Sequence, residues 1–221
     1  MRFSSRSCRR PQCPRRNLAG YPLAAELRPW ATGNFYQPRR PRGYIVTLEL
    51  AIGMMNTVMM ISVIGGETAS QQALALAEAV GQELARRGAT LVCGGGGGIM
   101  EAACCGARSA GGHTVGILPG CDARESPPNP YVEFPIFTGI GYARNPIVVL
   151  SGEAVIAIDG AYGTLSEIAY ALIHDIPLVG LDTWEFRYHD HDADRIVRAK
   201  DAADAVEKAI ALAEQRRAGA K

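Results

Sequence analysis

The sequence predicts an α/β fold, a mainly parallel sheet with layers of helices on both faces. Short apolar, β-branched runs alternate along the chain with longer segments whose apolar residues recur at helical spacing. Strands joined by crossover helices form parallel sheets that are covered on both sides. Glycine clusters follow three of the apolar runs, and such sheets bind ligands beyond the carboxyl ends of their strands. The position of the glycine clusters at these strand ends predicts a phosphate-bearing ligand.

The elements follow one another from about residue 56, so the chain divides into an extension, 1–55, and one nucleotide-binding domain, 56–221. Strands are expected at 58–64, 89–93, 113–118, 132–137, 154–158 and 177–181. Helices are expected at 68–87 or 70–87, 99–110, 142–150, 164–174 and 202–217. Thr68 or Ser70 can cap the first helix, and Gly88 can close it. Residues 182–199 are polar and show no clear pattern.

The extension is rich in Arg and Pro. Residues 1–53 hold ten Arg, no Lys and two acidic residues, a net charge of 10 − 2 = +8. Three interpretations stay open: an organelle transit peptide, a basic disordered tail, or a wrongly assigned start upstream of Met54, Met55 or Met59. A disordered segment or a wrongly assigned start would leave the fold of the domain unaffected.

The charge of the domain argues against nucleic acid as a partner. The whole chain carries +1, so the remaining residues carry 1 − 8 = −7. A mildly acidic domain has no general attraction for a polyanion. No run of about 18 apolar residues is present, so no membrane segment is expected either.

The six cysteines show neither a disulfide framework nor metal-binding spacing, which predicts reduced thiols and a cytoplasmic protein. The His- and Asp-rich stretch at 188–194 is interpreted as a solvated turn, and no metal site is predicted.

The glycine clusters supply most of the candidate ligand-binding residues. The first follows strand 58–64, and the second is a run of five glycines after strand 89–93. Five consecutive glycines cost backbone entropy on folding. A close approach of the backbone to a ligand explains such a run better than a simple turn does. The candidates from these two clusters are Gly65, Gly66, Gly94, Gly95, Gly96, Gly97, Gly98 and the nearby Met100.

The third cluster lies between strand 154–158 and the helix expected from Thr164. Free backbone N–H groups and the helix dipole make such a helix start an anion site. The candidates here are Asp159, Gly160, Ala161, Tyr162, Gly163 and Thr164. Glu167 follows in the first turn, where a carboxylate either complements the dipole or takes part in chemistry.

Two of these motifs resemble the LOG ("lonely guy") family, long mislabelled as lysine decarboxylases. The segment 94–100, GGGGGIM, resembles the GGGxxGLM element, and 159–167, DGAYGTLSE, resembles PGGxGTxxE. The likeness covers about residues 58–182. It is closer to a bacterial branch that includes the molybdenum-cofactor carrier proteins, through 94–119 and 143–167. It implies a single Rossmann-like α/β/α domain and a homo-oligomer, a dimer or tetramer.

Active members of the family hydrolyse the N-glycosidic bond of nucleoside 5′-monophosphates, which implies Glu167 and Arg144 as catalytic residues. The chain departs from the pattern in two places. Asp159-Gly160-Ala161 stands where hydrolases carry PGG, and Arg144-Asn145 stands where they carry Arg-Lys. Asp159 would place negative charge near the phosphate unless it points away.

Two functions from different classes are therefore expected. The first is a nucleotide-binding protein that hydrolyses nucleoside 5′-monophosphates and requires no cofactor. The second is a non-catalytic carrier or sensor whose bound ligand is the molybdenum cofactor, another pterin phosphate or a nucleotide. The retained Arg144 and Glu167 favour the enzyme, whereas the lost Lys and the altered PGG favour the carrier. Fold alone cannot choose between them.

Overall fold

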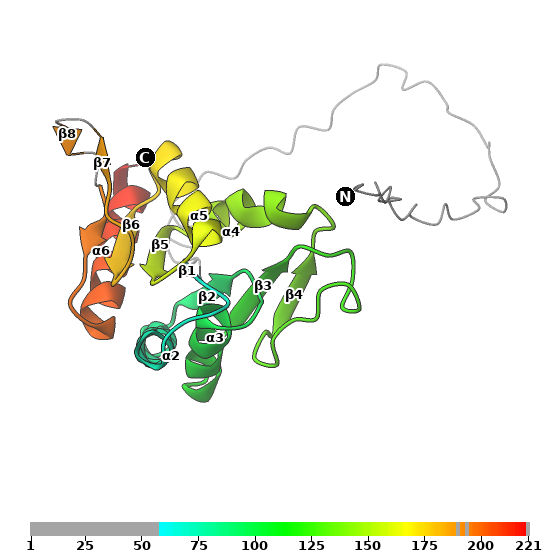
Figure 1. Ribbon diagram of the computed structural model, residues 1–221. Coiled ribbons are helices and arrows are strands. Elements are labelled where there is room, and N and C mark those ends of the chain that lie inside the picture. The colour runs from blue at the N-terminus through cyan, green and yellow to red at the C-terminus, as the bar shows by residue number, and fades with distance from the viewer. Residues whose placement is uncertain (1–57, 189–190, 193–194, 220–221) are drawn as a thin grey trace, which may run out of the picture. The chain divides into compact units, whose positions relative to one another are not determined.

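The protein is described here from a computed structural model, which covers residues 58–188, 191–192 and 195–219 (Figure 1). The strands are β1 (Met60–Gly65), β2 (Thr90–Cys93), β3 (Thr114–Leu118), β4 (Phe134–Phe137), β5 (Ala154–Ile158), β6 (Leu178–Leu181), β7 (Arg187–Tyr188), β8 (His191–Asp192) and β9 (Val197–Arg198). The helices are α2 (Gln71–Arg86), α3 (Ile99–Ser109), the 3₁₀ turn η1 (Gly141–Arg144), α4 (Asn145–Ser151), α5 (Tyr162–Ile173) and α6 (Ala202–Gly219).

The main sheet confirms the predicted α/β class. Its strand order is β4-β3-β2-β1-β5-β6-β9, and every pairing in it is parallel. The central strand β1 pairs with β2 on one side and β5 on the other, so Ile61 lies between Leu91 and Ala154. The chain first builds outward to β4 and then returns to β5. Such a change of direction leaves a crevice at the carboxyl ends of β1 and β5.

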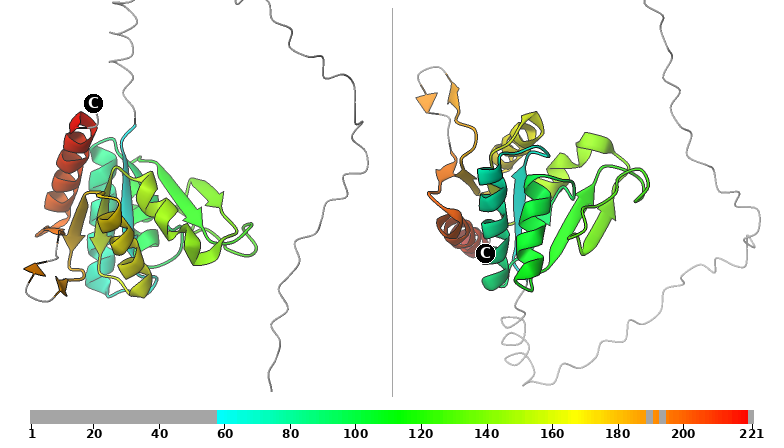
Figure 2. Two further views of the ribbon diagram at one scale, coloured as in Figure 1. Left: turned by 90° about the horizontal axis from the view of Figure 1, so that it is seen from above. Right: turned by 60° about the horizontal axis from the view of Figure 1, so that its bottom comes forward.

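Helices cover the two faces of the sheet in different numbers (Figure 2). One face is packed by α2, α3 and α6, whose apolar side chains join those of the central strands in one core cluster. The other face is packed by α4 and α5, which contribute Val148, Val149, Ile168 and Ala171 to a second cluster. The strands between them are fully buried: all five residues of β5 are inaccessible. This is the burial that a parallel sheet between two helical layers produces.

Three local expectations differ from the structure. The helix expected at 142–150 is split into η1 and α4, because Pro146 lacks an N–H and fits only in the first turn of a new helix. Helix α5 starts at Tyr162, two residues before Thr164. The patternless segment 182–199 contains the short strands β7, β8 and β9. Of the two expected caps, Ser70 is the one that accepts a hydrogen bond, from the N–H of Ala73.

Some expectations lie wholly or partly outside the described residues. The interpretations of the 1–55 extension concern residues that the structure does not describe. The 188–194 stretch, interpreted as a solvated turn, also lies partly outside the described residues. Within the described ranges, no helix is both long enough and apolar enough to cross a membrane.

Helices α2 and α3 touch backbone to backbone. A Cβ atom added at Gly106 would overlap the carbonyl oxygen of Glu78, and one at Gly81 would overlap that of Ala103. At each glycine, the absence of a side chain therefore lets the backbone of one helix pack directly against the backbone of the other. Because the glycine run leads directly into α3, this contact also positions that run at the carboxyl end of β2.

We expect Gly106→Ala to lower the free energy of unfolding by roughly 2 kcal/mol, because backbone cannot give way as a flexible side chain can. Gly163→Ala is the matched control, since its added Cβ has no neighbour within 4 Å. Urea denaturation of both variants measures the effect. Equal stability of the two would show that the helices can separate without cost.

Candidate functional site

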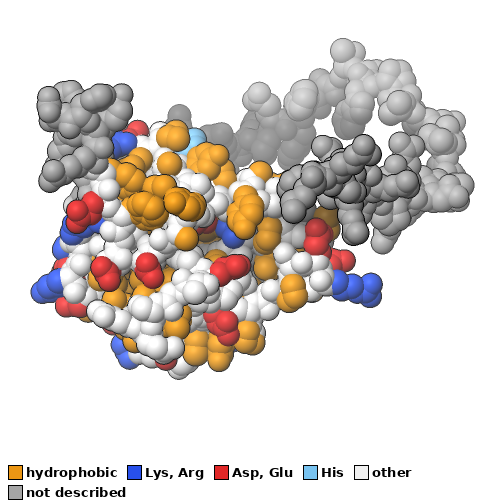
Figure 3. All heavy atoms as spheres, in the orientation of Figure 1, with side chains coloured by type: hydrophobic (Ala, Val, Ile, Leu, Met, Phe, Trp, Pro, Cys, Tyr) orange, Lys and Arg blue, Asp and Glu red, His pale blue; other side chains and the backbone are white. Residues whose placement is uncertain are grey.

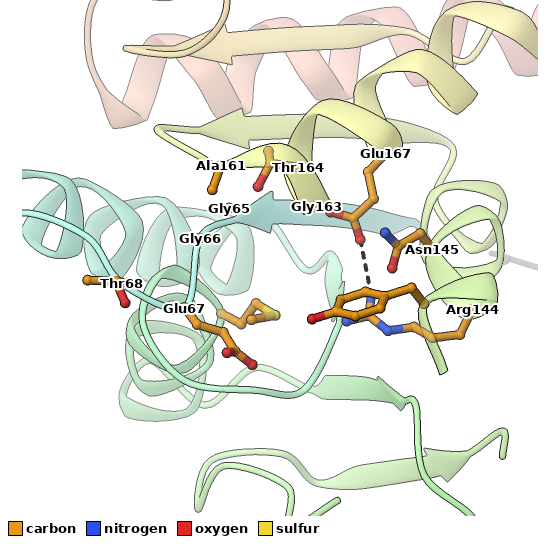
Figure 4. A pocket seen from close by; sticks show the side chains of 12 residues that line it. Gly65, Gly66, Glu67, Thr68, Arg144, Asn145, Ala161, Gly163, Thr164 and Glu167 are labelled. Carbon is orange, nitrogen blue, oxygen red and sulfur yellow. Dashed lines mark hydrogen bonds and ion pairs between the residues drawn. The ribbon is translucent and has the colours of Figure 1, made fainter. Parts of the chain in front are cut away.

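A pocket lies at the carboxyl ends of β1 and β5, where the sheet changes direction. Its volume is about 260 Å³, near the lower limit of small-molecule sites. It is lined by Gly65, Gly66, Glu67, Thr68, Met100, Tyr142, Arg144, Asn145, Ala161, Gly163, Thr164 and Glu167. Figure 4 shows Glu67 across the pocket from Ala161 and Thr164, with Arg144 and Glu167 along a third side.

The start of α5 forms the wall nearest to β5. Ala161 holds the N-cap position, and no side chain among the described residues caps the helix there. The first intrahelical bond of this turn is donated by the N–H of Leu165 to the carbonyl of Ala161, at 3.0 Å. The N–H groups before Leu165 are therefore left for an external acceptor. Together with the helix dipole, such free N–H groups are able to attract an anionic group.

A buried ion pair forms another wall. Nη1 of Arg144 donates to Oε1 of Glu167 at 3.1 Å, and the two side chains are only 11% and 8% exposed. Burial raises the pKa of Glu167 to about 7, against the opposing effect of the Arg144 charge. The carboxyl group can therefore change protonation near neutral pH, as groups in catalytic sites often do.

The second glycine cluster makes room for this arginine. A Cβ atom at Gly94 would lie 2.5 Å from Nη2 of Arg144 and 2.8 Å from Sδ of Met100. Gly98 has a φ of +63°, and a Cβ there would overlap the carbonyl oxygens of Gly66 and Glu67. At Gly94 and Gly98, the missing side chain therefore makes room for other atoms of the protein, whereas the sequence predicted room for a ligand.

The structure brings half of the sequence-predicted residues to the pocket lining. These are Gly65, Gly66, Met100, Arg144, Ala161, Gly163, Thr164 and Glu167. Gly94 lies directly behind Arg144. The remaining candidates are outside the lining: Gly95, Gly96, Gly97, Gly98, Asp159, Gly160 and Tyr162.

Asp159 lies outside the lining, with a left-handed backbone at φ +50°. Its carbonyl accepts a hydrogen bond from Oγ1 of Thr183 at 2.6 Å. Tyr162 is 82% exposed, and its ring lies beside that of Trp184 with 6.2 Å between centroids.

Four lining residues were missing from the sequence-based set: Glu67, Thr68, Tyr142 and Asn145. The first two follow Gly65-Gly66 directly, and Asn145 adjoins Arg144, so their position beside candidate residues was an available signal. Tyr142 had no such signal, because an exposed aromatic residue in a turn has no characteristic spacing. No group of three or more His, Cys, Asp or Glu in the described ranges lies close enough together to hold a metal ion.

Comparison with known proteins gives, among others, relatives named for the molybdenum cofactor and relatives named as phosphoribohydrolases. The molybdenum cofactor binding protein of Rippkaea orientalis is 34% identical, over 72% of this chain and 96% of that one, with a TM-score of 0.62. The molybdenum cofactor carrier protein of Chlamydomonas reinhardtii is 35% identical, over 73% and 99%, with a TM-score of 0.61. The cytokinin riboside 5′-monophosphate phosphoribohydrolase of Mycobacterium tuberculosis is 36% identical over 118 residues, which are 50% of this chain and 63% of that protein.

These relatives agree with the LOG-like resemblance of the two motifs and with the α/β architecture. A family model covers residues 58–214, nearly the whole described domain. The chain belongs to the SLOG cluster4 family.

Proposed function

We propose that the pocket binds a small molecule through its phosphate group, held by the N–H groups at the start of α5. The observation that carries the proposal is the position of that uncapped helix start in the same pocket as the buried Arg144–Glu167 pair. A helix start attracts the anionic phosphate, and Arg144 adds a positive charge nearby. The ligand is a nucleotide or a pterin phosphate, in line with the riboside 5′-monophosphate and the molybdenum cofactor in the names of the relatives.

The position of Glu167 favours the hydrolysis of nucleoside 5′-monophosphates as the reaction of this pocket. In that reaction water adds to C1′ of the ribose, the C1′–N bond breaks, and the base leaves with a proton from the water. An ionised carboxylate beside C1′ stabilises the positive charge that develops there and can accept the proton of the water. Arg144 keeps Glu167 in place through their ion pair.

A second candidate function is that of a non-catalytic carrier of the molybdenum cofactor. The solved relatives named for that cofactor match over nearly their whole length, whereas the hydrolase match covers 63% of the mycobacterial protein. Asp159-Gly160-Ala161 also replaces the PGG of the hydrolases. On this proposal the cofactor is cargo, and the same helix start would hold its phosphate.

The first experiment incubates the full chain with a panel of nucleoside 5′-monophosphates and follows free base by chromatography. Release of base supports the hydrolase. Thermal stabilisation by molybdopterin or by a nucleotide, without release of base, supports the carrier or sensor. If neither is seen, the proposal of a phosphate site is wrong.

Two further properties are proposed on narrower grounds. Cys93, Cys104 and Cys105 are free thiols, the state that a reducing compartment maintains, and this supports a cytoplasmic location. The outer faces of α4 and α5 expose Ile147, Leu150 and Ile173 to solvent, and Figure 3 shows hydrophobic side chains gathered over α5. An apolar helix face of this kind is usually covered, which supports a homo-oligomer.

We expect Glu167→Gln to lower the rate of base release by roughly a hundredfold or more, because the amide cannot balance charge at C1′ or accept the proton. Nucleotide affinity, measured by calorimetry, should change little, since the helix start is untouched and the amide oxygen of Gln can still accept the hydrogen bond from Nη1 of Arg144. Glu133→Gln is the matched control: Glu133 also pairs with an arginine, Arg108, outside the pocket. Unchanged turnover in Glu167→Gln would refute the catalytic role.

The raised pKa of Glu167 predicts opposite pH effects on stability and activity. Between pH 4.5 and about 7 the folded protein binds a proton that the unfolded chain has lost, so stability falls as pH rises. Relative to Glu167→Gln, the wild type should lose roughly 3 kcal/mol over this window. Base release should increase over the same window as the carboxylate ionises. Parallel pH profiles of unfolding for wild type and Glu167→Gln would contradict the assigned titration.

For the oligomer, we expect light scattering to show a dimer or tetramer for the wild type and a monomer for Ile173→Glu, because a charge cannot be buried unpaired in an apolar contact. Val58→Glu is the control, since Val58 is similarly exposed but precedes β1. A monomeric wild type at micromolar concentration would refute the proposed assembly.

A further inference from the structure

A short chain of hydrogen bonds links α4 to the first turn of α5. Nδ2 of Asn145 lies 2.8 Å from Oγ of Ser166, and Oγ of Ser166 lies 2.7 Å from the carbonyl oxygen of Gly163. Asn145 is 4% exposed and lines the pocket, as Gly163 does. The chain therefore runs from a buried amide to the turn that is proposed to hold the phosphate.

This chain determines which way the amide of Asn145 points. The carbonyl of Gly163 can only accept, so the hydroxyl hydrogen of Ser166 is committed to it. Ser166 must then receive a hydrogen from Asn145, and only the NH₂ group of the amide can supply one. The side-chain oxygen of Asn145 consequently points away from Ser166. The orientation follows from the network of donors and acceptors, which is how amide groups are assigned.

The oxygen of Asn145 and a nitrogen of its neighbour both lack partners. No described residue hydrogen-bonds to Oδ1 of Asn145 or to Nε of Arg144, although both atoms are buried. Buried polar groups normally have partners, and an orphaned one is costly. Both residues line the pocket, so a bound molecule is a suitable source of the missing bonds.

The two orphaned atoms have opposite needs. Oδ1 of Asn145 requires a donor, and Nε–H of Arg144 requires an acceptor. A hydroxyl group can meet both needs because it donates and accepts. An ammonium group can only donate, and a carbonyl or phosphate oxygen can only accept.

We propose that Asn145 is a specificity-determining residue whose side-chain oxygen accepts a hydrogen bond from a sugar hydroxyl of the phosphate-bearing ligand. The inference rests on the proposed function. The sugar is the part of a nucleotide bonded to the 5′-phosphate, and Asn145 is tied through Ser166 to the turn proposed to bind that phosphate. Ser166 is also the sequence neighbour of Glu167, which is proposed to act at C1′ of the same sugar.

The test compares nucleotides that differ by one hydroxyl. AMP and GMP are titrated into the full chain by calorimetry, together with their 2′-deoxy and 3′-deoxy counterparts. We expect the wild type to bind one deoxy form about tenfold more weakly, because that ligand leaves Oδ1 unsatisfied. Which deoxy form is weaker identifies the hydroxyl. For any nucleotide that is hydrolysed, the same ratio is taken from kcat/KM.

In Asn145→Leu, which removes the amide at similar size, the ratio between ribose and deoxy forms should fall to about one. Ser166→Ala tests the orientation without altering the pocket lining: the amide can turn, so the ratio should fall while binding persists. Ser109→Ala is its matched control, because Oγ of Ser109 makes the same bond to the carbonyl of Gly106, at 2.8 Å, in α3. The ratio should not change in that control.

The outcomes separate this inference from the proposed function. Binding or hydrolysis of nucleotides with equal preference for ribose and deoxy forms would overturn the role of Asn145 and leave the phosphate site standing. A preference that persists in Asn145→Leu would overturn it as well, because another group would then distinguish the hydroxyl. Failure of the wild type to bind any of these nucleotides would overturn the role of Asn145, and the phosphate site would then fall only if molybdopterin gave no thermal stabilisation either.

Discussion

The ion pair between Arg144 and Glu167 is the interaction on which the pocket depends. Its two partners lie on either side of α4 and β5 in the chain, and their 3.1 Å contact joins η1 to the second turn of α5. The guanidinium reaches this position only because Gly94 carries no side chain. The glycine cluster, the split between η1 and α4, and the first turns of α5 are therefore parts of one arrangement. A buried pair of this kind is costly to break, since either charge alone would lack compensation.

The polar groups of the pocket are unevenly distributed. Free N–H groups gather at the start of α5, whereas the carboxylate of Glu67 lies across the pocket (Figure 4). A phosphate is attracted to the first region and repelled by the second, so the two ends favour one orientation of a bound ligand. Hydrolase and carrier could share this orientation. They would differ in whether the bound ligand places an N-glycosidic bond beside Glu167. One pocket could therefore serve both functions, and relatives of both names can share its fold.

Much of the fold could be predicted from the sequence because its strands are short, apolar and fully buried. The runs at 154–158 and 89–93 are bounded by turn residues and leave little ambiguity. The break at Asn145 was missed although Pro146 marks it, because the apolar residues on either side keep helical spacing. The site was harder. Sequence motifs indicated Arg144, Glu167 and the start of α5, but the role of Gly94 depends on an arginine fifty residues away, and the orphaned oxygen of Asn145 appears only once Ser166 is in place.

The central claim is that the start of α5 recognises phosphate. The most direct measurement compares each nucleoside 5′-monophosphate with its unphosphorylated nucleoside by isothermal titration calorimetry on the full chain. We predict that at least one monophosphate binds and that its nucleoside binds at least about a hundredfold more weakly. The nucleoside lacks the charged phosphate that accepts hydrogen bonds from the N–H groups at the start of α5. Equal affinity of a monophosphate and its nucleoside would contradict the account.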